Sequence, residues 1–249
     1  MRKLSFESHQ DAHDLDAQVD PKMRATATGR NAAGPRRSFL RDAATTIAAV
    51  PALVLLSSSR SQASTPNTIP SLYPGWNARN FHEIQADEDA HVPFIINAIT
   101  GLGGTPRPKP TFQNLFFPKA SSFVMTSQTF ENTGVGAYQA AAPLISNPTV
   151  LMAALSIALV EGLHSGYLNT LVNTPIVPGG SSFSQPLTVP VIVQRASPFI
   201  ASLNGGPDPS TEISATPSPA NDIAILNFAL LLEYLEKEFY DINVPFFFH

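Results

Sequence analysis

The stretch Val160-Glu161-Gly162-Leu163-His164 sets a glutamate and a histidine three residues apart inside an apolar run. The same spacing recurs in Glu88-Asp89-Ala90-His91. Three residues correspond to about 300° of rotation in an α-helix, so the two side chains of each pair project from one face, one turn apart. Each pair can therefore offer one oxygen and one nitrogen to a single metal ion.

Two further glutamates stand alone in apolar surroundings. Glu131 is the only charged residue in the 120–160 stretch, and Glu233 lies inside the run Phe-Ala-Leu-Leu-Leu-Glu-Tyr-Leu at 228–235. A charge buried alone among leucines is costly, so each glutamate needs a partner or a metal. One lone glutamate on each of two helices, with one Glu-x-x-His on each of two others, is the ligand pattern of dinuclear carboxylate bundles.

Apolar spacing predicts four long helices and therefore an all-α fold. Asn147-Pro148 predicts a tight turn, so the second and third helices should be antiparallel neighbours. Asn221-Asp222 is expected to cap the fourth helix. In the third helix, the residues expected to face the core are Leu151, Leu155, Leu159, Leu163 and Leu168. The expected bounds are Trp76–Leu102, Ala120–Ile145, Thr149–Val172 and Asn221–Ile242.

Two long connectors join these helices. Residues 105–119 contain four prolines and, if extended at ~3.3 Å per residue, reach roughly 45 Å, longer than a 25-residue helix. This connector can cross the bundle end to end, which leaves the first two helices parallel. Residues 173–220 form a second crossing, with a short helix expected within 189–203.

Three segments carry a resemblance to a known family. They are Phe130-Glu131-x-x-Gly134-x-x-Ala137-Tyr138, Val160-Glu161-x-x-His164, and the 225–240 segment with its Leu-Glu-Tyr-Leu-Glu core. They resemble the bacterial ferritin-like domain family, which often carries a twin-arginine signal and is similar to plant desiccation-related proteins. The resemblance covers most of residues 72–242 and implies a ferritin-like four-helix bundle.

This resemblance also implies a dinuclear centre of two iron or manganese ions. Glu88 and Glu161 have the placement of ligands that bridge both ions, Glu131 and Glu233 that of terminal ligands, and each histidine would bind one ion. Tyr138 and Tyr240 each lie seven residues after a ligand glutamate and are expected to be the catalytic side chains, donating hydrogen bonds or protons. Glu236 and Glu238 are expected at the surface or beside the ligand set, and Asp87 at the surface. The six implied ligands are Glu88, His91, Glu131, Glu161, His164 and Glu233.

Helix order departs from the family pattern, because the Leu-Glu-Tyr-Leu-Glu helix comes first in the relatives and last here. The chain is therefore expected to be circularly permuted. Two alternatives stay open: the last helix begins a truncated second copy, or it pairs with another subunit by swapping. Pro93 is a second departure, because it removes a helical hydrogen bond just after His91.

Composition excludes several kinds of site. The chain has 249 residues and no cysteine, which removes disulfides, thiolate zinc sites and cysteine-ligated clusters. The net charge of −4 argues against nucleic-acid binding. Residues 64–249 carry six Lys/Arg and thirteen acidic residues, whereas residues 1–63 are net basic. The two parts therefore have different roles.

Residues 1–63 are interpreted as a disordered region followed by an export signal. Arg36-Arg37-Ser38-Phe39-Leu40 resembles the twin-arginine signal, and the apolar run that follows it is too short to span a bilayer of about 30 Å. A membrane anchor or a basic arm is the alternative. Cleavage is expected after Ala63, which leaves residues 64–249 as the helical bundle in the periplasm or outside the cell, without stable membrane insertion.

The leading functional hypothesis is a dinuclear non-haem oxidoreductase that acts with oxygen or peroxide, a small-molecule oxidant. The alternative is a non-catalytic, stress-protective bundle like the desiccation-related proteins. Iron storage in a cage fits less well, because the long insert would disturb a shell-forming surface. A homo-oligomer stays open. Glu88 and His91, taken alone, would more often form a solvated helix face.

Overall fold

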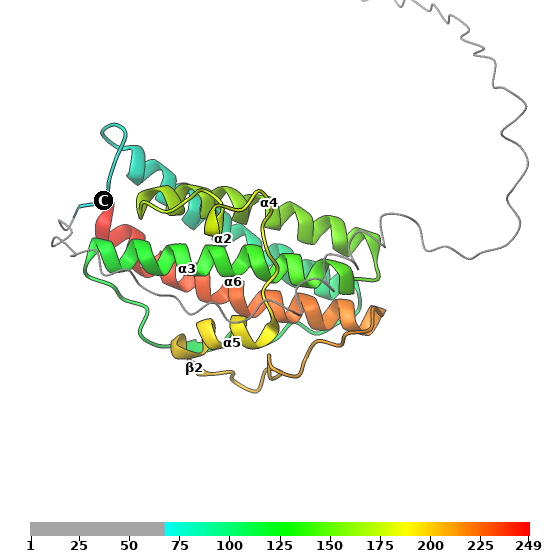
Figure 1. Ribbon diagram of the computed structural model, residues 1–249. Coiled ribbons are helices and arrows are strands. Elements are labelled where there is room, and N and C mark those ends of the chain that lie inside the picture. Colours follow the sequence, from blue (N-terminus) through cyan, green and yellow to red (C-terminus); the bar gives the residue numbers. More distant parts are fainter. Residues whose placement is uncertain (1–67) are drawn as a thin grey trace, which may run out of the picture. The chain divides into compact units, whose positions relative to one another are not determined.

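The computed structural model describes residues 68–249. The twin-arginine segment, the expected cleavage after Ala63 and the boundary at residue 63 lie outside the described residues. The predicted all-α four-helix bundle is confirmed (Figure 1). The elements are α2 (Trp76–Gly101), β1 (Thr111–Phe112), α3 (Ala120–Ala141), η3 (Ala142–Leu144), α4 (Pro148–Leu171), η4 (Pro178–Gly180), α5 (Val189–Ala196), η5 (Ser197–Phe199), β2 (Ile200–Ser202) and α6 (Pro219–Phe247).

The contacts at the two ends of the bundle fix the directions of its helices. At one end, the ring of Phe81 at the start of α2 lies 4.9 Å from that of Phe123 in α3 and 5.1 Å from that of Phe248 after α6. At the other end, the carboxylate of Asp222 in α6 accepts a hydrogen bond from the N–H of Ser146, just before α4. The helices α2 and α3 are therefore parallel, as the connector predicts, and α4 and α6 run the opposite way (Figure 1).

The four helices form two closely packed pairs, α2 with α6 and α3 with α4. The last helix in the chain thus lies beside the first long helix, and its apolar side enters the common core. Phe228, Leu232 and Phe239 of α6 are buried there. The C-terminal helix therefore completes the bundle within the same chain and needs no second subunit to do so.

The start of α6 differs from its prediction. The helix begins at Pro219, and Ser218 caps it by accepting a hydrogen bond from the N–H of Asn221. Asn221 and Asp222, expected as caps, lie in the first turn instead. Both are buried, and the Asp222 carboxylate bonds the turn before α4. The predicted turn at Asn147 is correct, because its side chain caps α4 by accepting from the N–H of Thr149.

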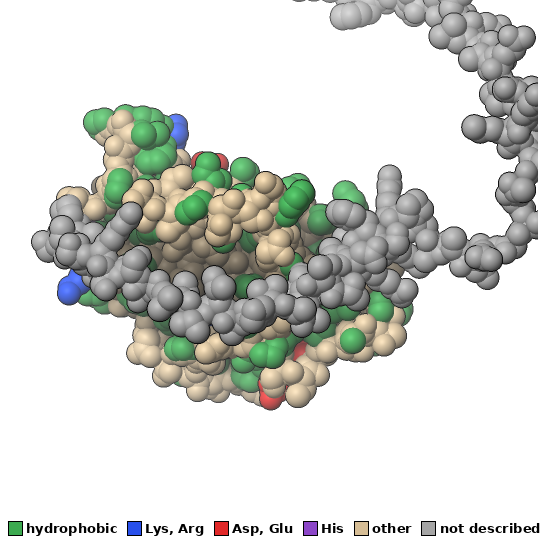
Figure 2. Space-filling view, viewed as in Figure 1, with side chains coloured by type: hydrophobic (Ala, Val, Ile, Leu, Met, Phe, Trp, Pro, Cys, Tyr) green, Lys and Arg blue, Asp and Glu red, His purple; other side chains and the backbone are tan. Residues whose placement is uncertain are grey.

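The core-facing side of α4 was predicted correctly at Leu168, which is buried, but wrongly at three other leucines. Leu155, Leu159 and Leu163 are 41%, 72% and 74% exposed. Figure 2 shows hydrophobic side chains on this outer face of the molecule. Among the described residues, α4 is the one helix long and apolar enough to cross a membrane, by length and composition alone. The residues that it buries are Val150, Ala154, Ile157, Glu161, His164, Ser165, Leu168, Asn169 and Leu171.

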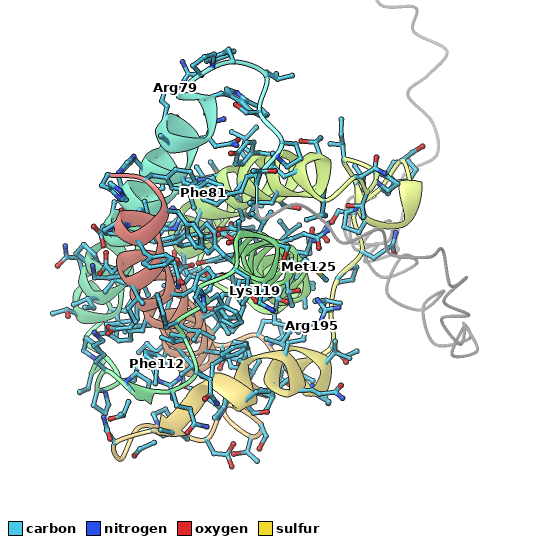
Figure 3. All side chains as sticks on the ribbon, turned by 90° about the vertical axis from the view of Figure 1, so that its left-hand side faces the viewer. Arg79, Phe81, Phe112, Lys119, Met125 and Arg195 are labelled. Carbon is cyan, nitrogen blue, oxygen red and sulfur yellow. The ribbon has the colours of Figure 1, made fainter. Side chains whose placement is uncertain are left out.

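The connectors wrap the bundle and are tied to α6. The strand β1 pairs antiparallel with β2, a small sheet that the sequence did not predict. The guanidinium of Arg107, 3% exposed, donates to the carbonyl oxygens of Asn227 in α6 and Pro207 in the second connector. The expected short helix is α5, and Figure 3 shows its Arg195 beside α3, where it donates to the hydroxyl of Thr133. These contacts hold α5 over the α3/α6 side of the bundle.

Candidate metal centre

Six side chains from the four long helices meet in the middle of the bundle. Their ligand atoms form two overlapping groups, and within each group all the atoms lie within 4.8 Å of one another. Glu88 and Glu161 belong to both groups. The first group adds His91 and Glu233, and the second adds Glu131 and His164. Each group could hold one metal ion, so Glu88 and Glu161 lie between two candidate metal positions, and two further side chains lie at each position.

The helices position these side chains because each motif falls on a buried stripe. In α2, Glu88 and His91 share a stripe with Ile84, Val92 and Ile95. The helix runs through Pro93 to Gly101, so the proline does not break it. The glutamates in the centre are at most 1% exposed and the histidines at most 8%. The solvated-face interpretation of Glu88 and His91 therefore does not hold.

Each imidazole faces the carboxylates of more than one helix. The Nδ1 of His91 lies 3.1 Å from Oε2 of Glu88 and 3.1 Å from Oε2 of Glu233. The Nδ1 of His164 lies 3.1 Å from Oε2 of Glu131 and 3.2 Å from Oε1 of Glu88. In both rings Nδ1 is thus the atom directed at the glutamates. Each end of the centre therefore has one histidine nitrogen that could bind a metal ion.

Two buried tyrosines bond Glu233 and Glu131 across helices. The Tyr138 hydroxyl of α3 donates to Oε1 of Glu233 in α6 at 2.5 Å. The Tyr240 hydroxyl of α6 donates to Oε1 of Glu131 in α3 at 2.6 Å. Each tyrosine therefore orients the glutamate of the opposite helix and not the one that precedes it on its own helix. Burial and the neighbouring glutamate charges raise the pKa of both hydroxyls well above the usual range.

Burial and the clustered glutamates together shift the pKa values of both histidines, Glu88 and Glu161. Burial lowers the pKa of both imidazoles, but the glutamates beside them outweigh it and raise the pKa of His91 to about 10 and that of His164 to about 11. Burial raises the pKa of Glu88 to about 7, against the bonds to both histidines. Burial and nearby carboxylates raise the pKa of Glu161 well above its usual range. The metal-free centre thus retains protons that metal ions would displace.

The residues present fit a pair of divalent ions. Both side-chain oxygens of Glu161, and Oε1 of Glu88, are buried and make no well-formed hydrogen bond among the described residues. The nearest donors are imidazole nitrogens, 3.6 Å from Oε1 of Glu161 and 3.2 Å from Oε1 of Glu88. These oxygens belong to the two glutamates shared by both groups of ligand atoms. Buried carboxylate oxygens without donors are costly, and a metal ion supplies what they lack. Four carboxylates and two neutral imidazoles also balance the charge of two divalent ions.

Sequence reasoning missed Asp87 and Gly134 in this region and left the place of Glu236 open between two alternatives. Asp87, expected at the surface, lies with Oδ2 3.0 Å from Nε2 of His164 and can fix the orientation of that ring. Glu236 is 4% exposed, so its surface alternative is wrong. A Cβ atom on Gly134 would lie 2.4 Å from Oε2 of Glu161, so only glycine leaves room for that carboxylate. Glu236 and Gly134 each follow a terminal glutamate by three residues, a spacing that could have marked them.

Four helices in two pairs, with converging Glu-x-x-His motifs and lone glutamates, define the class of ferritin-like helical bundles. The family model for the ferritin-like domain matches residues 40–174, more than half of the chain. The protein belongs to the ferritin-like domain family. The match includes α2, α3 and α4, and α6 lies beyond it. Neither the curated proteins nor the solved structures contain a match to this chain.

Proposed function

We propose that this protein binds a dinuclear iron or manganese centre and acts as an oxidoreductase towards oxygen or peroxide. The observation that carries the proposal is the convergence of two overlapping sets of ligand atoms, each drawn from four residues on three helices. When bound, the two ions would supply electron transfer to a small oxidant. Carboxylates that diverged would instead have favoured a purely structural bundle.

Each ligand has a distinct task in this proposal. Glu88 and Glu161 belong to both positions and would hold the ions as a pair. Glu233 with His91, and Glu131 with His164, would complete one position each, and these roles remain predictions. All six side chains project from long helices, so the site is rigid before metal binds, which favours affinity.

The two tyrosines are proposed to control the terminal glutamates. The hydroxyl of Tyr138 holds Oε1 of Glu233, which leaves Oε2 turned towards His91. Tyr240 does the same for Glu131, whose Oε2 lies beside His164. A hydroxyl in this place fixes the carboxylate and can also deliver a proton to it. Their catalytic role, expected from sequence, is thus one of orientation and proton supply.

Export by the twin-arginine route with cleavage after Ala63 remains part of the proposal. It rests on Arg36-Arg37 before Ser38-Phe39-Leu40 and on the contrast between a basic head and an acidic body. Because that route carries folded proteins, the centre would be assembled before export. The protein would then work in the periplasm or outside the cell.

Circular permutation is proposed as the origin of the helix order. The family match ends at residue 174, and the helix that brings Glu233 comes only at 219–247. Residues 173–218 would then join the two ends of the bundle that are the chain termini in the relatives. Packing of α6 against α2 supports this view, because it fills the place of a first helix in the bundle.

Metal analysis tests the function directly. Protein reconstituted with Fe(II) or Mn(II) should hold about two ions per chain, and Glu161→Gln should lose tight binding of the pair because the shared ligand is weakened. Glu83→Gln is the matched control, since Glu83 is an exposed glutamate of α2. Fewer than one ion per wild-type chain, or unchanged stoichiometry in Glu161→Gln, would overturn the proposal.

A further inference from the structure

A cavity lies beside the proposed centre, between α3, α5 and α6. About 50 Å³ of it can hold the centre of a water molecule, within about 550 Å³ of space that includes the open mouth. Ile192 of α5 and Phe228 and Leu232 of α6 are among the apolar side chains that line it. Apolar cavities with a few polar groups in their walls are the usual sites for small organic molecules.

The wall of the cavity next to the centre is polar and belongs partly to the ligand set. Glu233 and its partner Tyr138 line it, together with Gly134 and Glu236. Gly134 is the residue against which the Glu161 carboxylate packs. A molecule in the cavity would therefore lie against the position formed by Glu233 and His91. The opposite position, with Glu131 and His164, does not border the cavity.

Glu236 is the feature of this wall that the fold leaves unexplained. Its side chain is buried, its Oε2 has no hydrogen-bond donor, and no ion pair to it forms within residues 68–249. Arg195, which lines a small neighbouring cavity with Glu236, donates instead to Thr133. An unbonded carboxyl group in an apolar cavity is costly unless a bound molecule or water supplies the donor.

We propose that this cavity binds a small, neutral, mainly apolar organic substrate with one hydrogen-bond donor, such as an alcohol or a phenol, whose donor bonds Glu236. The class follows from the lining: the apolar walls exclude an anion, and Glu236 selects a donor. The inference rests on the proposed function in one respect, because only a metal centre makes the bound molecule a substrate. The binding itself needs no metal ion.

The probes are phenol and toluene, which share a shape and differ in the hydroxyl donor. Titration calorimetry on the purified protein, with and without Mn(II), should show phenol binding about tenfold more tightly than toluene, the effect of one hydrogen bond to a carboxylate. Glu236→Leu should abolish the preference for phenol while it leaves toluene binding in place. Equal binding of the two probes, or a preference that survives Glu236→Leu, would overturn the proposal.

A second pair of variants tests the location. Ala229→Phe, on the cavity wall, should abolish binding of both probes, and Ala98→Phe, equally half-buried but away from the cavity, should leave both unchanged. Thermal unfolding of each variant shows whether it is folded, and Glu236→Leu carries the test if Ala229→Phe is not. Phenol binding without metal uptake would refute the proposed function alone. Metal uptake without phenol binding would refute this inference alone.

Discussion

The close packing of the Glu161 carboxylate against Gly134 gives the sharpest prediction. Gly134 lies inside α3, and a Cβ atom added there would stand 2.4 Å from Oε2 and 3.1 Å from Cδ of Glu161. Those separations are too short for any unbonded contact, so the Glu161 carboxylate must leave its place in Gly134→Ala. The substitution therefore removes a shared ligand without changing any ligand residue.

The effects of Gly134→Ala on folding and on metal binding should differ in size. Alanine is favoured over glycine in a helix interior by about 1 kcal/mol, and overpacking a rigid core costs about 1–3 kcal/mol. Because the clashing atoms are the end of a flexible side chain, the free energy of unfolding without metal should change by less than about 2 kcal/mol. Loss of a group that only supports a metal ligand typically lowers the affinity 10- to 100-fold. Displacing a side chain that is proposed to bind both ions should therefore lower the affinity for Mn(II) at least about 100-fold.

The control is Gly162→Ala, in the middle of α4. A Cβ atom there meets nothing within 4 Å, so it should stabilise the helix by up to about 1 kcal/mol and leave metal binding alone. Urea unfolding of the metal-free proteins measures the first effect, and Mn(II) titration measures the second. Wild-type affinity in Gly134→Ala would refute the placement of Glu161 between the two ions.

Three further predictions concern the surroundings of the centre. Tyr138→Phe and Tyr240→Phe should each weaken Mn(II) binding about 10- to 100-fold with unchanged circular dichroism; unchanged affinity would exclude their orienting role. The free energy of unfolding of the metal-free protein in urea should fall as pH rises from 5 to 9. The reason is that Glu88 and His91, with pKa values raised to about 7 and about 10, bind more protons in the folded than in the unfolded protein. Each such proton lowers the free energy of unfolding by about 1.4 kcal/mol per pH unit. The free energy of unfolding of the metal-loaded protein should instead rise with pH, because protons compete with the ions for the ligands. The same slope with pH in both forms would contradict one of these two statements. Asp222→Ala should cost about 1–3 kcal/mol in the same assay, because the partly buried N–H donors of Ser146 and Asn147 lose their acceptor; no measurable loss would show that water replaces it.

The sequence predicted which residues of α4 carry chemistry but not which face it buries. Leu155, Leu159 and Leu163 form an exposed apolar stripe, whereas Ala154, Ile157 and Leu168 form a buried one. Apolar spacing alone therefore selects neither. The polar pair would have decided it, because Ile157 and Ala154 lie one and two turns before Glu161 on the same stripe. A polar ligand in an apolar helix is thus a better guide to the interior than its leucines.

The tyrosine partners could not be predicted from one helix. Seven residues span about 10.5 Å along a helix axis, so Tyr138 cannot reach the glutamate that precedes it on α3. Its partner, Glu233, comes from α6, 95 residues further along the chain. Spacing shows that the hydroxyl shares a face with the ligand, but only the packing of helices decides which carboxylate it meets. Asp87 reaches His164 of α4 for the same reason.

The two halves of the centre are alike in their ligands and different at one position. The pair α3/α4 supplies Glu131 with a Glu-x-x-His, and the pair α6/α2 supplies Glu233 with another. Three residues after the lone glutamate, α3 has Gly134, which admits the Glu161 carboxylate, and α6 has Glu236, which lines the cavity. In the proposed centre the two ion positions would therefore be inequivalent. One would face an apolar cavity with an unbonded carboxyl group, and the other would be backed by the partly exposed Asp87, so a molecule in the cavity would reach only the first of the two positions.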